Sequence, residues 1–194
     1  MVKDDMIDEM NSLKQKIYLC KRCNLWKTRT NPVVGEGSLT TNIMFIGEAP
    51  GYNEDQQGKP FVGRAGKIFD ELLNSIGLKR KDIYITNILK CRPPDNANPS
   101  PEQIKACSPY LDEQIKIIQP KIIVTLGNFA LSYIFDKFRL KQEKISSIHG
   151  RVFTLANLVG IEKIVAMYHP AVAAYNPSMK AILIKDFKTI GDYL

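Results

Sequence analysis

The sequence lacks several features that would place it in a common protein class. No apolar run reaches the roughly 18 residues that a membrane-spanning helix needs, although 44% of the 194 residues are apolar. The N-terminus, MVKDDMIDEMNSLKQ, contains no apolar segment of the kind found in secretory signals. The chain has neither a P-loop nor a dinucleotide-binding glycine pattern. We therefore expect a cytoplasmic protein with no membrane partner.

The chain also lacks internal repeats and low-complexity tracts, and its length suits one domain with a substantial core. We expect a single domain over residues 1–194 that acts as a monomer. The formal net charge is +7 and the pI is about 9.2. Nucleic acid as a partner would explain this charge, and so would the lysine-rich surface of a heat-adapted protein. Charge alone does not choose between them.

Four apolar segments rich in Ile and Val predict strands, namely 42–46, 83–89, 121–126 and 163–167. The stretches between them have helical character. Because parallel strands need such crossovers, the pattern predicts an α/β fold. We expect a three-layer sandwich with a central, mainly parallel sheet.

The best helix signal lies over residues 100–118, with Ser100 as N-cap, Pro101 at the first helical position and Gln103 at the capping-box position. Pro109 predicts a bend or an interruption in that helix. A second helix is predicted from about Gly66 to Gly77. Near the N-terminus, one helix face is predicted to carry Met6, Ile7, Met10, Leu13 and Ile17.

Candidate functional residues follow the predicted strands directly. In an open parallel sheet the ligand crevice lies beyond the carboxyl ends of the strands. The first strand runs into Gly47-Glu48-Ala49-Pro50-Gly51, the second carries Asn87 near its end, and the fourth runs into Tyr168-His169-Pro170. We expect these loops to converge on one site.

The four cysteines form a second candidate site. Cys20 and Cys23 are separated by two residues, and Cys91 and Cys107 follow far downstream. Disulfides are disfavoured in a reducing cytoplasm, so a metal site is the stronger interpretation. Zinc and a [4Fe-4S] cluster both accept four cysteine ligands, and the spacing does not choose between them.

Together these residues resemble the iron-sulfur uracil-DNA glycosylases, known as family 4. The resemblance covers most of the chain and rests on GEAPGYNEDQQGKPFVGRAG, TNILKCRPP, YHPA and the four cysteines, all in the family's order. It implies an α/β fold of the uracil-DNA glycosylase type and a [4Fe-4S] cluster on Cys20, Cys23, Cys91 and Cys107. It also implies a DNA repair enzyme that flips uracil out of DNA, hydrolyses its N-glycosidic bond and leaves an abasic site.

The resemblance also assigns roles to the loop residues. Phe61 is expected to stack against the flipped uracil, and Asn87 to read its edge through one donor and one acceptor. His169 is expected at O2, where its N–H and backbone amides around Gly47 and Glu48 would stabilise charge on the departing base.

Two further roles in this pocket concern carboxylates. Glu54 is the candidate that excludes the methyl group of thymine. Adjacent Asp55 either serves this role instead or caps the following turn. Where better-known glycosylase families carry a water-activating Asp, this chain has Ala49. Glu48 has the chemistry to activate water, whereas a dissociative sugar cation needs little base assistance, and we favour the dissociative route.

Outside the pocket, Val172 or Tyr175 is a candidate wedge for the DNA stack, and Lys180 a candidate phosphate contact. Lys90 and Arg92 flank Cys91 and are expected either to bind the DNA backbone or to tune the cluster. The run Lys79-Arg80-Lys81 is interpreted as a solvated turn.

The expected partner is uracil-containing DNA, single- or double-stranded, with replication or repair proteins as further partners. Two alternatives stay open, a non-enzymatic metal protein that binds nucleic acid and a nucleotide-processing enzyme that uses GEAPG for phosphate.

Overall fold

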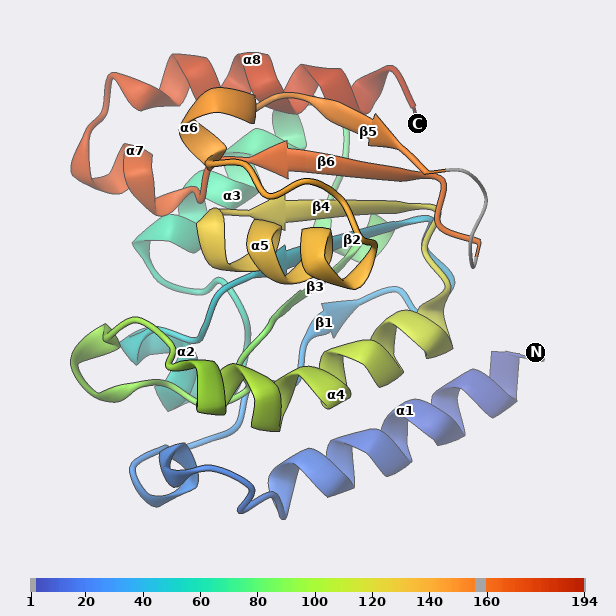
Figure 1. Cartoon of the computed structure of the whole chain (residues 1–194), viewed down its shortest axis with the longest axis vertical. Coiled ribbons are helices and arrows are strands. Elements are labelled where there is room, and N and C mark those ends of the chain that lie inside the picture. The colour runs from blue at the N-terminus through green and yellow to red at the C-terminus, as the bar shows by residue number, and fades with distance from the viewer. Residues whose placement is uncertain (1–2, 156–159, 194) are drawn as a thin grey trace.

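The computed structural model describes residues 3–155 and 160–193, and Figure 1 shows its arrangement. A central sheet has the strand order β1-β3-β2-β4-β6-β5. Its strands are β1 (Glu36–Gly37), β2 (Ile43–Gly47), β3 (Tyr84–Asn87), β4 (Ile122–Leu126), β5 (Val152–Thr154) and β6 (Lys163–Met167). The four inner strands are parallel, and β1 and β5 are antiparallel edges. The expected mainly parallel sheet is confirmed, whereas the edge strands are too short to show a sequence period.

Helices cover both faces of the sheet (Figure 1). One face carries α1 (Lys3–Tyr18), α4 (Pro101–Ile118), α5 (Asn128–Lys137) and α6 (Ile145–Ile148). The other carries α3 (Arg64–Ser75), α7 (Ala171–Tyr175) and α8 (Met179–Gly191). Short helical segments lie in the connections, namely η1 (Asn24–Lys27), α2 (Tyr52–Gln57), η2 (Arg80–Asp82) and η3 (Pro94–Asn96). The three-layer α/β sandwich is therefore confirmed.

The buried centre of the sheet explains why its strands were readable in the sequence. Every residue of β2 and β4 is buried, as expected for strands covered by helices on both faces. The predicted bounds of the four inner strands differ from the observed bounds by no more than two residues. Among the residues that the structure describes, no helix is long and apolar enough to cross a membrane.

Helix α4 begins as predicted. The Ser100 hydroxyl accepts a hydrogen bond from the Gln103 backbone N–H at 3.3 Å, and the Gln103 side chain accepts one from the Ser100 N–H at 2.9 Å. Pro109 does not interrupt the helix, which continues to Ile118. This capped start matters for function because the same helix carries Cys107 and Gln114.

Helix α1 corrects one detail of the expected apolar face. Met6, Met10, Leu13 and Ile17 are buried, but Ile7 is 40% exposed. The four buried residues recur at helical spacing and form one stripe, and Ile7 lies about 100° around the helix from Met6. The stripe packs into the core shared with α4, which places the end of α1 beside Cys20.

Candidate functional site

The loops that follow β2, β3 and β6 converge on a pocket of about 430 Å³ at one edge of the sheet. They meet because the three strands are parallel and their carboxyl ends share that edge. The lining residues are Glu48, Ala49, Pro50, Gly51, Glu54, Phe61, Ala65, Asn87, Pro93, Asn96, Ala97, His169, Ala171 and Tyr175. Every substrate-binding residue expected from sequence is in this list except Gly47. The lining residues that sequence reasoning missed are mainly Asn96 of η3, its neighbours Pro93 and Ala97, and small side chains with no signal of their own.

Asn87 is the most informative residue of the pocket. Its side chain is buried, and its Oδ1 has no hydrogen-bond partner, the one such buried side-chain atom in the described part of the chain. An unsatisfied buried acceptor costs about 1–3 kcal/mol, so the site is built for a donor that arrives from outside. Gly47 lies directly beside it, and a Cβ there would collide with Asn87 Oδ1 and with the Phe61 ring. Gly47 therefore shapes the pocket without lining it.

His169 has a defined tautomer. The Ala171 backbone N–H donates to His169 Nδ1 at 3.1 Å, so in the neutral ring the proton sits on Nε2. Burial lowers the pKa of His169 to about 4, and the nearby Glu54 carboxylate only partly opposes that effect. At neutral pH the imidazole is therefore uncharged and keeps Nε2–H as a donor.

Phe61 lies in the pocket wall with an unusual backbone. Its φ is +52°, a left-handed conformation that costs energy for a bulky residue. Its ring lies over the ring of His169, with a centroid separation of 5.5 Å, and against Phe69 at 5.3 Å. A Cβ on Gly66 would collide with the Phe61 carbonyl, so the turn is packed from below by a residue without a side chain.

Arg80 holds this turn from behind, which corrects the expectation of a solvated residue at that position, whereas Lys79 and Lys81 are exposed as expected. Its guanidinium donates to the carbonyls of Pro60 and Phe61 and to Asp70 Oδ1, the last at 2.7 Å. The side chain is only 22% exposed. Sequence gave no signal for this role, because Arg80 and Phe61 are brought together by the packing of η2 against α3 and its preceding turn.

Glu54 and Asp55 on α2 act on two different segments. Glu54 Oε1 accepts hydrogen bonds from the backbone N–H groups of Val62 and Gly63, both at 2.9 Å. Asp55 is buried, and its carboxylate accepts from the Thr30 backbone N–H at 3.0 and 3.1 Å. Glu54 thus stays a candidate for base selection, whereas Asp55 ties α2 to the segment after η1.

Glu48 and Glu54 are the carboxylates among the pocket-lining residues. Burial raises the pKa of Glu48 above its usual range. The Glu48 carbonyl accepts from the Leu89 N–H at 3.0 Å, which fixes the backbone of this loop against the end of β3. Ala49 is partly buried against the core, and it offers no acid or base.

The residues expected to contact DNA lie in different settings. Tyr175 is 87% exposed at the end of α7 and also lines the pocket, whereas Val172 packs against the core. Lys180 is paired with Glu71, with a separation of 2.5 Å between Nζ and Oε2. Arg92 lies over the Tyr52 ring at 5.2 Å and donates to Asn96 Oδ1.

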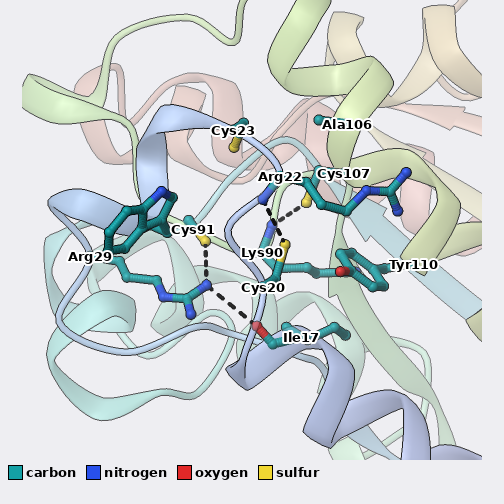
Figure 2. Close-up of a pocket in the computed structure, with 11 residues that line it drawn as sticks. Ile17, Cys20, Arg22, Cys23, Arg29, Lys90, Cys91, Ala106, Cys107 and Tyr110 are labelled. Atoms are coloured by element: carbon teal, nitrogen blue, oxygen red, sulfur yellow. Dashed lines mark hydrogen bonds between the residues drawn. The ribbon is translucent and has the colours of Figure 1, made fainter.

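The four cysteines line one small cavity at the end of α1 (Figure 2). Figure 2 shows their sulfur atoms pointing toward a common space, although the residues come from three distant parts of the chain. Three donors face these sulfurs: Arg29 Nη1 lies 3.1 Å from Cys91 Sγ, the Lys90 N–H 3.2 Å from Cys107 Sγ, and the Arg22 N–H 3.5 Å from Cys20 Sγ. Such donors stabilise thiolates, so the chemistry of the site fits a thiolate-bound metal or cluster.

The thiols are not arranged as a finished metal centre. In the described residues, no group of three or more Cys, His, Asp or Glu side chains is positioned to hold a metal ion. Burial raises the pKa of Cys91 and raises that of Cys107 to about 12, which favours the protonated thiols. Metal binding would displace those protons, because cysteine binds a metal as the thiolate. Zinc and [4Fe-4S] both remain compatible with the donor set.

Lys90 lines the same cavity but is 1% exposed. This burial corrects the expectation that Lys90 binds the DNA backbone. Desolvation lowers the pKa of Lys90 to about 7, with the neighbouring Cys107 and Cys91 opposing the shift. Its ammonium points away from solvent into a polar network that includes Thr86 and Gln114.

Comparison with known proteins gives consistent matches. Residues 34–189 match the family model described as the uracil DNA glycosylase superfamily. The type-4 uracil-DNA glycosylase of Saccharolobus solfataricus is 47% identical, over 97% of this chain and 88% of the relative. The type-4 uracil-DNA glycosylase of Archaeoglobus fulgidus is 45% identical, over 96% of this chain and 94% of the relative. The type-4 uracil-DNA glycosylase of Thermotoga maritima is 40% identical, over 95% of this chain and 94% of the relative.

Proposed function

This chain belongs to the uracil-DNA glycosylase superfamily, and we propose that the pocket described above is where it binds and releases uracil. The relatives show that it is a hydrolase that removes uracil from DNA in repair, as a type-4 enzyme. The residue roles below are our proposals. The observation that carries them is the unpartnered Oδ1 of Asn87 inside the pocket.

Asn87 reads the base. Its Oδ1 accepts from uracil N3–H and its amide nitrogen donates to O4. Cytosine presents the reverse pattern, a bare N3 and an exocyclic amine, and would leave buried polar groups unpaired. Sites that depend on such hydrogen bonds reject the wrong analogue by about 10⁴-fold or more. The burial of Asn87 supports this role, because a buried polar group that the wrong base leaves unpaired costs about 1–3 kcal/mol.

Phe61 supplies the surface on which the flipped base stacks. An enzyme that acts on a base must extrude it from the helix, and the cost of unstacking is offset by new contacts in the pocket. The Phe61 ring is fixed by Phe69 below it and by Arg80 behind its carbonyl, so it does not have to be ordered when DNA binds. Gly47 leaves the space beside the ring open.

His169 and the adjacent backbone stabilise the leaving group. When the C1′–N1 bond breaks, its electron pair moves onto uracil, and negative charge develops on O2. The Nε2–H of the neutral His169, together with amides around Gly47 and Glu48, donates to that oxygen. The acceptor role of Nδ1 toward Ala171 keeps the ring in the orientation that this donation requires.

Water then adds to the sugar cation at C1′, and the proton it gives up ends on the released uracil anion. We assign the orientation of this water to Glu48, because it lines the pocket and Ala49 has no acid-base group. The dissociative route needs only weak base assistance at this step. Glu54 is the proposed barrier to the thymine methyl group, with its carboxylate fixed by the amides of Val62 and Gly63.

Cys20, Cys23, Cys91 and Cys107 are the proposed ligands of a [4Fe-4S] cluster. When bound, the cluster supplies a structural staple between the end of α1 and the loop after β3. The protein is proposed to act as a cytoplasmic monomer of one domain on single- or double-stranded DNA, with replication or repair proteins as further partners. A reducing compartment keeps such thiols available as ligands.

The test is cleavage of matched oligonucleotides that carry U or T at one position, read as alkali-sensitive strand breaks at an abasic site. Uracil DNA should be cut and thymine DNA should stay intact. Asn87→Ala should abolish cutting while circular dichroism stays unchanged. Full activity in that variant would remove Asn87 and this pocket from the proposal. A pure metalloprotein that only binds DNA would cut neither substrate.

A further inference from the structure

Lys90 is a buried side chain whose Nζ is surrounded by three hydrogen-bond acceptors. Its Nζ donates to Thr86 Oγ1, to Gln114 Oε1 and to the backbone carbonyl of Asn87, each at 2.7 Å. An ammonium has three N–H donors, so these three acceptors satisfy it fully. Burying a lysine is costly, and such a group is retained only where its contacts compensate.

Two of these acceptors, Thr86 and Gln114, belong to a buried hydrogen-bond network. Thr86 Oγ1 donates to the Val34 carbonyl at 2.8 Å, and Gln114 Nε2 donates to the same carbonyl at 2.8 Å and lies 3.1 Å from the Tyr84 hydroxyl. Thr86, Gln114 and Tyr84 are all buried. The Lys90 side-chain nitrogen is therefore held in place by buried core residues.

The backbone of Lys90 is held at both ends as well. Its N–H donates to Cys107 Sγ at 3.2 Å, and its carbonyl accepts from the Val33 N–H at 2.7 Å. Figure 2 shows the bond to Cys107 beside the cavity of the four cysteines. One residue thus contacts a proposed metal ligand through its main chain and the uracil-reading residue through its side chain.

We propose that Lys90 is a positioning residue that fixes Asn87 for uracil recognition and ties that residue to the four-cysteine site. The proposal rests on the proposed function of Asn87. Asn87 is the last residue of β3, and its buried backbone carbonyl needs a hydrogen-bond donor. Lys90 supplies that donor, and the Asn87 side chain can then keep its Oδ1 directed into the pocket without a protein partner.

The experiment compares Lys90→Met with Thr86→Val and Lys105→Met in the iron-loaded protein. Lys90→Met keeps an unbranched apolar stem that ends at the position of Cε, and it removes Nζ with its donors. Thr86→Val removes one acceptor from the same network but leaves the Asn87 contact. Lys105 is exposed on α4, so its replacement controls for the loss of one positive charge.

The readouts are iron content, melting temperature and binding of an oligonucleotide that contains 2′-fluorinated deoxyuridine. The fluorine destabilises the sugar cation, so the glycosidic bond of this probe resists cleavage. The matched probe carries cytosine with the same fluorine. Lys90→Met should lose about tenfold in affinity for the uracil probe, as for one lost hydrogen bond, and a similar factor in the uracil-over-cytosine ratio. Thr86→Val should lower the melting temperature with the ratio unchanged, and Lys105→Met should change neither.

An unchanged uracil-over-cytosine ratio in folded Lys90→Met would overturn the proposal, and so would an equal loss of ratio in Thr86→Val. If Lys90→Met does not fold, Lys90→Gln replaces it, because the shorter amide keeps polar contact with the network but does not reach Asn87. Failure of both variants to fold would assign Lys90 to stability alone. Loss of uracil cleavage in Asn87→Ala together with an intact ratio in Lys90→Met would leave the proposed function standing and remove only this inference.

Discussion

The rings of Phe61 and His169 lie 27° from parallel, with their centroids 5.5 Å apart. One comes from the turn before α3 and the other from the loop after β6, so the pair joins two loops that are more than a hundred residues apart. The proposed stacking platform and the proposed leaving-group donor therefore pack against each other. A change that moves Phe61 should also disturb His169.

Arg80→Lys should weaken binding of uracil DNA by about 1–3 kcal/mol, the usual value of base-aromatic stacking, and so approach Phe61→Ala. A lysine cannot reproduce the forked contact with the Pro60 and Phe61 carbonyls. Binding titrations with uracil and abasic oligonucleotides measure the effect, and added guanidinium should partly restore Arg80→Ala. Lys81→Ala on the same turn is the control. Equal affinity of wild type and Arg80→Lys for uracil DNA would show that the Arg80 guanidinium is not needed to hold Phe61 in place.

His169→Ala should lower the single-turnover cleavage rate by about 10²-fold or more, as for the loss of an oxyanion donor. DNA binding should change less, because the donor acts mainly on charge that develops as the bond breaks. Rapid-quench cleavage and a separate binding titration distinguish the two effects. A rate equal to wild type would exclude His169 from the mechanism.

His169 should titrate with a pKa of about 4, observed by NMR of the imidazole, with Nε2 protonated at neutral pH. Its unfolded-state pKa is about 6.5, so the unfolded chain takes up the proton first as the pH falls. This group therefore stabilises the fold fully above about pH 6.5, and that contribution is lost as the pH falls toward 4. Between pH 7 and pH 5, wild type should lose up to about 2 kcal/mol more stability than His169→Gln. An equal loss of stability between pH 7 and pH 5 in wild type and His169→Gln, measured by denaturation, would contradict the lowered pKa of His169.

Asn87→Asp should shift discrimination from uracil toward cytosine while total activity falls. An ionised carboxylate offers only acceptors, so it repels O4 of uracil and accepts from the cytosine amine. The loss against uracil should reach about 10⁴-fold. Single-turnover cleavage of matched U and C oligonucleotides provides the measurement, after circular dichroism has shown that the variant is folded. Retention of the wild-type preference would mean that another residue reads the base.

Protein purified without oxygen should be yellow-brown and contain about four irons per chain. Cys20→Ala should lower the melting temperature more than it lowers the cleavage rate, since the ligand holds the end of α1 to the rest of the chain. Iron analysis and thermal melts test both statements. Stoichiometric zinc in freshly purified protein would mean that the four cysteines form a zinc site and not a [4Fe-4S] site. An unchanged melting temperature in Cys20→Ala would argue against a structural metal.

Much of the fold was predictable because its signals are local. The inner strands are buried on both faces and appear as Ile- and Val-rich runs, and the capping residues of α4 lie within four positions of one another. The short edges β1 and β5 were not predictable, because two or three residues carry no period. Ile7 was misassigned since an apolar residue next to a helical stripe looks the same in sequence as one within it.

The sequence by itself determined the α/β architecture, the family and the set of candidate site residues, because each depends on residue types at short spacings. Only the tertiary structure decided that Arg80 supports Phe61 and that Lys90 contacts Asn87 instead of DNA. It also decided that Asn87 Oδ1 is left without a partner inside the pocket. These relationships join side chains through the packing of helices against a sheet, and a basic residue looks the same in sequence whether its charge faces water or the core.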